Sequence, residues 1–111
     1  MFFSKIPEMT VEQLKEKLDK KERFILLDVR EPREHQQASI PQAKLVPMAE
    51  LPNRLGELDK SQEIAVMCKA GGRSARVTKM LRENGFNAVN VAGGIDAWSD
   101  RIDPSVPHYT Y

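Results

Sequence analysis

The chain has 111 residues, of which 41% are hydrophobic and 30% charged, a composition typical of one globular domain. Its net charge of +1 comes from intermixed acids and bases, which excludes the basic face that binds nucleic acid. One cysteine excludes an internal disulfide, two isolated histidines make a metal site unexpected, and no apolar run approaches the length of about 20 residues that spans a bilayer. We therefore expect a single-domain cytoplasmic protein with no metal, no cofactor and no membrane partner.

The amino-terminal half predicts two helices and two strands. After an arm at residues 1–9, Thr10 can cap a helix, and Gln13 completes a capping box with it. The elements that follow are an apolar strand at 24–27, a short helix at 31–35 and a short strand at 44–46. The first of these strands is apolar throughout, which is typical of a strand buried on both faces of a parallel sheet.

The carboxyl-terminal half continues the alternation. Three leucines on one stripe predict a helix over 47–58, with Pro52 tolerated only near its start. The elements that follow are a buried strand at 63–68, a helix at 75–84 that ends before Gly85, a strand at 89–91 and a helix after Gly93. The last segment, 103–111, predicts an extended tail along the surface. Strands alternating with helices imply a three-layer α/β/α domain around a mostly parallel sheet of four to five strands.

The single cysteine, Cys68, ends a predicted central strand, and ligands of open α/β sheets bind at that end of the strands. Gly71 and Gly72 allow positive φ, so that successive N–H groups of the loop can point at one anion. The following helix adds its positive end, and Lys69 and Arg73 add full charges at the rim, all of which favour a thiolate. The alternative is that Cys68 is a small buried hydrophobe at the end of a strand.

The spacing around Cys68 indicates what such a loop would hold. Lowering a thiol's pKa by about two units speeds its attack only about threefold, because nucleophilicity falls with the pKa. Holding a second anionic atom bonded to the cysteine is a better use of several inward N–H donors. Cysteine phosphatases use C-x5-R, whereas residues 68–73 read C-x4-R. The smaller ring suits a single sulfur atom better than a phosphoryl group.

Three motifs in order resemble the rhodanese-like sulfurtransferases. The sequence C-K-A-G-G-R-S at 68–74 resembles the active-site loop of that family, D-V-R-E-P at 28–32 a second signature and G-G-I-D-A-W at 93–98 a third. The resemblance implies a rhodanese-like fold and a persulfide mechanism. A donor such as thiosulfate would give its sulfur to the cysteine, and cyanide, a thiol or a sulfur-carrier protein would remove it.

The resemblance also implies the roles of individual residues. Cys68 is the expected catalytic residue, and Asp28 and Arg30 are candidate supporting residues that could equally form a structural ion pair. The residues expected to bind the donor and the transferred sulfur are Lys69, Ala70, Gly71, Gly72, Arg73 and Ser74. Where the family usually has G-H-I-P-G-A, residues 38–43 read A-S-I-P-Q-A, which leaves the conformation of that turn open.

The tail sequence suggests a partner protein, and two other functions are alternatives to sulfur transfer. The sequence D-P-S-V-P-H-Y at 103–109 is similar to the tail of rhodanese domains fused behind E1-like adenylating enzymes, which implies an adenylating enzyme or a sulfur acceptor as partner. A non-catalytic interaction module of the same fold is a second hypothesis, although such modules usually lose the loop cysteine. A related cysteine phosphatase or arsenate reductase is a third, and the length of the loop argues against it.

Overall fold

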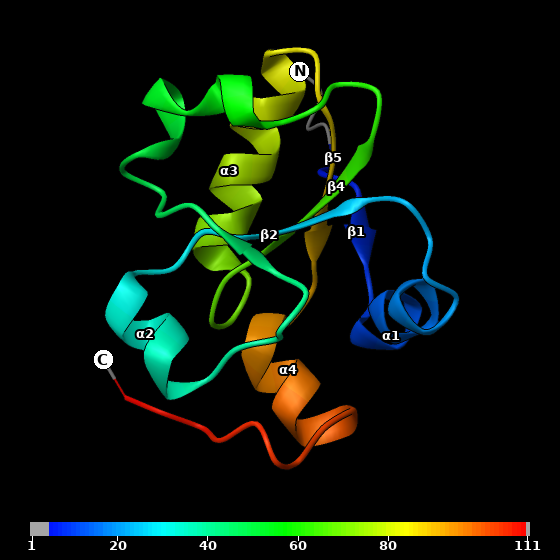
Figure 1. The fold of residues 1–111 in the computed structure, drawn as a ribbon, viewed down its shortest axis with the longest axis vertical. Helices are drawn as coiled ribbons and strands as arrows, with labels where there is room; N and C mark the ends of the chain where they lie inside the picture. Colours follow the sequence, from blue (N-terminus) through cyan, green and yellow to red (C-terminus); the bar gives the residue numbers. More distant parts are fainter. Residues whose placement is uncertain (1–4, 111) are drawn as a thin grey trace.

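Five parallel strands form the sheet of the computed structural model, which describes residues 5–110 (Figure 1). In spatial order they are β1 (Glu8–Met9), β5 (Asn87–Val91), β4 (Glu63–Met67), β2 (Ile25–Asp28) and β3 (Lys44–Leu45). Every neighbouring pair is parallel, and β4, which precedes the cysteine loop, lies in the middle. The predicted α/β class with a parallel central sheet is confirmed.

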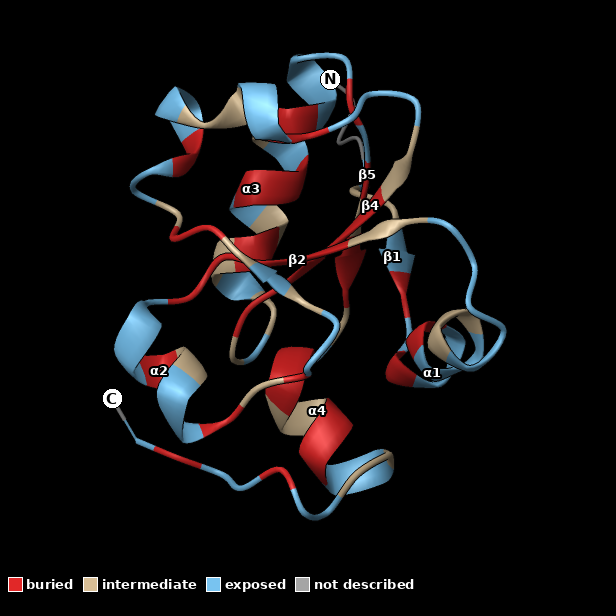
Figure 2. Cartoon of the chain, in the orientation of Figure 1, coloured by how far each residue is buried: buried red, intermediate tan, exposed pale blue. Residues whose placement is uncertain are grey.

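Helices cover both faces of this sheet. They are α1 (Val11–Asp19), α2 (Pro32–Gln37), α3 (Gly72–Glu83) and α4 (Gly94–Arg101). Alternate residues of β4 serve two apolar cores: Ala65 packs with the core that contains α1 and α4, and Val66 with the core that contains α3. Figure 2 shows the buried residues of β2 and β4 running through the molecule between these helices. This alternation produces the expected three layers.

The first helix begins as predicted. The side chain of Thr10 accepts the N–H of Gln13 at 3.1 Å, and the side chain of Gln13 accepts the N–H of Thr10 at 2.8 Å. The capping box is therefore complete, and it satisfies donors that the first turn of a helix leaves without intrahelical partners. Val11 and Leu14 then point into the core and are fully buried.

The arm at residues 1–9 contributes a strand that the sequence did not predict. Glu8 of β1 is in register with Asn90, and Met9 with Val91, at the edge of the sheet. A strand of two residues is too short to display a period, so only its pairing with β5 reveals it.

The predicted helix over 47–58 is wrong. The structure has two 3-10 turns there, η1 (Leu51–Asn53) and η2 (Leu55–Glu57). Pro52 has no N–H to donate and Gly56 weakens a helix, so the segment closes only short i→i+3 turns. Its leucines still anchor it, because Leu51 and Leu58 are buried in the core beside α3.

The described part of the tail, residues 103–110, has no regular secondary structure, yet it is anchored to the domain. Figure 1 shows it passing beneath α4 toward α2. Val106 and Tyr109 are each only 8% exposed, and the hydroxyl of Ser99 donates a hydrogen bond to the carbonyl of Val106. The segment predicted to run along the surface therefore buries two of its side chains.

Candidate active site

Cys68 lies directly after β4, at the carboxyl end of the central strand. Its side chain is 1% exposed, and its Sγ atom accepts a hydrogen bond from the N–H of Gly71 at 3.1 Å. The N–H of Ser74 donates to the same sulfur at 3.4 Å, and the Ser74 hydroxyl lies 3.2 Å from it. Two backbone amides and one hydroxyl thus converge on Sγ.

This geometry bears on both interpretations of Cys68. The side chain packs with apolar residues of the core that contains α3, as a buried hydrophobe would. The neighbouring amides nevertheless point toward the sulfur instead of away from it. A hydrophobe needs no such donors, whereas an anion at this position would be stabilised by them.

Positive φ is needed at only one of the two loop glycines. Gly71 has φ of 109° and caps α3, whereas Gly72 is the first residue of the helix and does not have a positive φ. The helix thus begins earlier than the predicted residue 75, which places Arg73 and Ser74 in its first turn. The positive end of α3 consequently faces the sulfur of Cys68.

The beginning of α4 holds the other side of the loop. The N–H of Ile95 donates to the carbonyl of Cys68 at 2.9 Å, and the N–H of Asp96 donates to the carbonyl of Lys69 at 3.0 Å. A Cβ atom on Gly94, whose φ is 57°, would lie 2.5 Å from both of these carbonyl oxygens. The glycine pair of G-G-I-D-A-W therefore allows α4 to approach the loop and bind its carbonyl groups.

Both cations of the loop are paired with carboxylates. Lys69 Nζ lies 2.9 Å from Asp96 Oδ2. The guanidinium of Arg73 makes a two-pronged contact with Glu34, through Nη1 to Oε1 at 2.7 Å and Nη2 to Oε2 at 2.9 Å. The side chains of Lys69 and Arg73 are only 20% and 25% exposed. The positive charges expected at the rim are present, but each is balanced by a neighbouring acid.

Glu34 is fully buried at the centre of this arrangement. Burial raises the pKa of its carboxyl group, but hydrogen bonds from Arg73, from the Tyr109 hydroxyl and from the N–H of Glu31 outweigh burial and hold the pKa at about 2. Burial also raises the pKa of Tyr109 far above its ordinary value, and Glu34 adds to that increase against the opposing effect of Arg30. At neutral pH, a carboxylate therefore accepts a hydrogen bond from an intact phenol.

Asp28 and Arg30 form a buried ion pair at the carboxyl end of β2. Arg30 Nη2 lies 2.7 Å from Asp28 Oδ2, and both side chains are fully inaccessible to solvent. Arg30 also donates to the carbonyl of Ala38 at 2.7 Å, and Ala43 donates to the carbonyl of Ile40 at 3.0 Å within the turn that departs from the family pattern. In this structure, Asp28 and Arg30 stabilise the position of α2 and of the turn that follows it.

Several residues of the site were not predicted from the sequence. Glu34, Asp96 and Tyr109 contact the side chains of loop residues, and Asn90 donates to the carbonyl of Gly71 at 3.3 Å. Glu34 offered a local signal, because it completes a capping box at the start of α2. Nothing local indicated its contact with Arg73, which lies 39 positions later in the chain.

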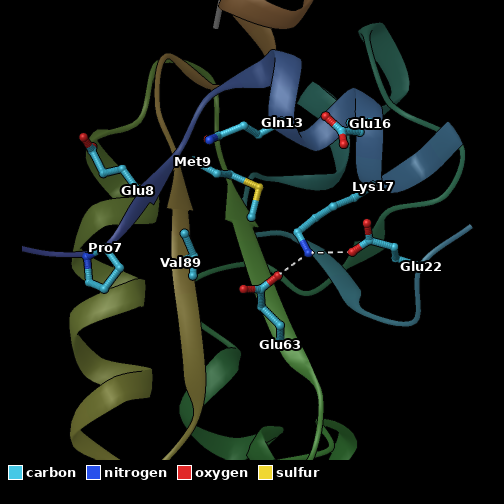
Figure 3. A pocket seen from close by; sticks show the side chains of 9 residues that line it. All are labelled: Pro7, Glu8, Met9, Gln13, Glu16, Lys17, Glu22, Glu63 and Val89. Carbon is cyan, nitrogen blue, oxygen red and sulfur yellow. Dashed lines mark hydrogen bonds and ion pairs between the residues drawn. The ribbon is translucent and has the colours of Figure 1, made fainter. Parts of the chain in front are cut away.

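A separate cleft lies beside β1 and α1. Its volume is about 450 Å³. In Figure 3, Lys17 reaches between Glu22 and Glu63, at 3.0 and 2.7 Å. None of its lining residues belongs to the loop at 68–74.

Within residues 5–110, no three His, Cys, Asp or Glu side chains are grouped to hold a metal ion, and no helix is long and apolar enough to cross a bilayer.

Comparison with known proteins identifies the family. The model of the rhodanese-like domain matches residues 10–101. The Bacillus subtilis protein YtwF is 41% identical over 99 residues, a match that covers 89% of this chain and 96% of YtwF. A sulfurtransferase of Allochromatium vinosum is 35% identical over 95 residues, covering 85% of this chain and 89% of that protein. The chain therefore belongs to the rhodanese-like family.

Two further similarities concern the fold and the adenylating proteins. A rhodanese-like domain protein from Staphylococcus aureus superimposes with a TM-score of 0.82 at 35% identity, and the match covers 95% of this chain and all of that one. The adenylyltransferase and sulfurtransferase MOCS3 of Arabidopsis thaliana is 33% identical over an alignment of 114 positions, and the match covers 87% of this chain but only 25% of MOCS3. The rhodanese-like fold and the relation to the rhodanese domains of adenylating proteins are thereby confirmed.

Proposed function

We propose that the chain is a sulfurtransferase that carries sulfane sulfur on Cys68 as a persulfide. The observation that carries this proposal is the convergence of the Gly71 and Ser74 amides and the Ser74 hydroxyl on Sγ, in a chain of the rhodanese-like family. The relationship to sulfurtransferases supports it. Retention of the cysteine argues against a non-catalytic module, and C-x4-R spacing argues against a phosphatase.

The reaction consists of two displacements on sulfur. With thiosulfate as donor, the Cys68 thiolate attacks the outer sulfur, the new S–S bond forms, and sulfite leaves with the electron pair of the bond that breaks. The terminal sulfur of the persulfide then carries the negative charge. Cyanide or an acceptor thiolate attacks that sulfur, and the Cys68 thiolate is the leaving group. No external oxidant or reductant is needed.

The loop residues have different roles in this reaction. Amide groups along residues 70–74 stabilise the negative charge on the terminal sulfur, because preorganised N–H donors in a site with little water cost no rearrangement during the reaction. Lys69 and Arg73 orient an anionic donor at the rim. Thiosulfate, or a persulfide on another protein, is the donor class that this arrangement suits. A protein thiol or a sulfur carrier is the proposed acceptor in the cell, with the similarity to MOCS3 favouring a relay to an adenylating enzyme.

Mass spectrometry of the intact protein tests the proposal directly. After incubation with thiosulfate, the parent protein should gain the mass of one sulfur atom and lose it on addition of cyanide. The Cys68→Ser variant should gain nothing and should not turn over. Turnover by that variant would contradict the proposal. Full partner binding by the variant, with no persulfide in the parent, would indicate an interaction module instead.

A further inference from the structure

The tail reaches the loop through the side chain of Tyr109. The hydroxyl of Tyr109 donates to Glu34 Oε2 at 2.7 Å and accepts a hydrogen bond from Arg30 Nη1 at 2.9 Å. The ring of Tyr109 faces Lys69, whose Nζ lies 5.2 Å from the ring centroid. A residue from the last few positions of the chain is thus buried between α2 and the cysteine loop.

The contacts of Glu34 show what the hydroxyl of Tyr109 does. Oε1 accepts hydrogen bonds from Arg73 Nη1 and from the N–H of Glu31, and Oε2 accepts hydrogen bonds from Arg73 Nη2 and the Tyr109 hydroxyl. Each carboxylate oxygen therefore has one bond to Arg73 and one bond that fixes its own position. Without the hydroxyl, Oε2 would lose the bond that holds it independently of Arg73.

Packing alone does not explain a tyrosine at this position. A phenylalanine would fill the same space, whereas a buried hydroxyl must find partners or reduce stability. Both partners of this hydroxyl are charged side chains, and hydrogen bonds to charged groups are about twice as strong as neutral ones. These contacts are those expected of a hydroxyl that fixes the orientation of the Glu34 carboxylate.

We propose that Tyr109 is a positioning residue for the sulfur-transfer reaction. It fixes the carboxylate of Glu34, and through Glu34 it holds the guanidinium of Arg73 in the orientation that binds an anionic donor. The inference rests on the proposed function, because Arg73 matters here only if the loop accepts a sulfur donor. It adds the tail to the residues that determine donor affinity.

The Tyr109→Phe variant tests this role because it keeps the ring and removes only the hydroxyl. In thiosulfate-to-cyanide assays, the KM for thiosulfate should rise about tenfold while kcat changes by less than about twofold. A merely structural role would lower the fraction of active protein, which reduces apparent kcat and leaves KM unchanged. The Ile64→Val variant, a buried change in β4 outside this network, serves as the control for lost stability.

A double-mutant cycle with Arg73→Lys determines whether Tyr109 acts through Arg73. Removing the hydroxyl in that background should raise KM by less than about twofold, because the guanidinium it orients is gone. Equal increases in both backgrounds, or an unchanged KM in Tyr109→Phe alone, would overturn the inference. If Tyr109→Phe does not fold, Glu34→Asp replaces it, since it keeps the charge but withdraws the carboxylate from Arg73, and the same rise in KM is expected.

The mass assay separates the two proposals. A parent protein that never gains sulfur from any donor would remove the proposed function, and the inference about Tyr109 with it. A parent that gains sulfur normally, together with a Tyr109→Phe variant of unchanged KM, would remove only the inference.

Discussion

Cys68 combines two environments that usually occur apart. Its side chain packs with buried apolar residues, while its sulfur accepts hydrogen bonds from Gly71 and Ser74. Apolar surroundings exclude water, and a charge on sulfur therefore depends strongly on the few donors that face it. The Ser74 hydroxyl, 3.2 Å from the sulfur, is the one hydrogen-bonding group of this set that a substitution can remove without changing the backbone.

The Ser74→Ala variant should load sulfur about three- to tenfold more slowly than the parent, because it loses one hydrogen bond to sulfur and keeps the amide. The rate of persulfide formation from thiosulfate, followed by intact mass, measures the effect. Ser61→Ala, in an exposed turn where Ser61 contacts Asp59, is the matched control and should load at the parent rate. Equal rates in all three proteins would mean that the hydroxyl does not stabilise the charged sulfur.

Asp28 should matter for stability and not for donor binding. The Asp28→Asn variant leaves the Arg30 guanidinium buried without its counter-charge, so we expect the free energy of unfolding in urea to fall by about 3–5 kcal/mol. Asp19→Asn removes the partner of Lys15 from an exposed pair and should cost less than about 1 kcal/mol. The folded fraction of Asp28→Asn should retain the parent KM for thiosulfate. A raised KM at unchanged stability would instead place Asp28 among the donor-binding residues.

At the scale of elements, the close approach of α4 to the cysteine loop explains the motif G-G-I-D-A-W at residues 93–98. Its first amides bind the carbonyl groups of Cys68 and Lys69, which fixes two peptide groups beside the sulfur. A side chain on Gly93 would also meet Ala97, with its Cβ 2.6 Å from the Cβ of Ala97. The motif thus describes a close contact between a helix and a loop that are far apart in sequence.

Substituting Gly94 by alanine should therefore disturb the loop as well as the fold. The new Cβ would collide with two backbone carbonyl groups, and φ is positive, so the free energy of unfolding should fall by at least about 2 kcal/mol. Sulfur loading by the folded protein should be more than about tenfold slower. Gly56→Ala, where no atom lies within 4 Å of the new Cβ, should change stability by less than about 0.5 kcal/mol. Similar values for the two variants would contradict this account.

The elements that the sequence predicted share a local cause. The capping box at Thr10 and the proline at the start of α2 act within a few residues, so their patterns are sufficient. The wrong helix over 47–58 shows the limit of periodicity. A leucine stripe is also compatible with 3-10 turns when Pro52 lacks an N–H to donate and Gly56 lowers the helix propensity. The strand at Glu8–Met9 depends wholly on its partner β5 and had no local signal.

The candidate site was predictable to a similar extent. Cys68 and its glycine loop stand together in the sequence, and the end of a central strand is where α/β sheets bind ligands. The carboxylates that pair with the loop cations come from α2 and α4, and the tyrosine comes from the tail. Such contacts depend on the tertiary arrangement, and a sequence without structure shows only that the charges exist.

At the scale of the whole molecule, buried charges connect the tail, α2 and the loop. Arg30 and Arg73 are linked through Tyr109 and Glu34, so two separate ion pairs belong to one network. The tail completes this network and closes the core beneath α4 through Val106. Stability and the orientation of Arg73 therefore depend on the same ionised carboxylate.

The stability of the domain should consequently fall as Glu34 takes up a proton. Its pKa in the folded protein is about 2, below the ordinary value of 4.5, so the unfolded state binds this proton more readily. The contribution of Glu34, about 3 kcal/mol, is fully present above about pH 5 and is lost as the pH falls toward 2. Urea unfolding across this range should show the loss in the parent, and a flatter profile in Glu34→Gln.

The control for this pH dependence is Glu57, whose pKa Arg54 and then Lys44 hold below its ordinary value from an exposed position. That group is exposed, so water and salt screen its pair in a way that they do not screen the buried one. The free energy of unfolding of Glu57→Gln should therefore fall with pH almost as much as that of the parent. Added salt should reduce any difference between the two profiles. If Glu57→Gln flattened the profile as much as Glu34→Gln, the acid sensitivity would arise from surface charge and not from the network that joins the tail to the loop.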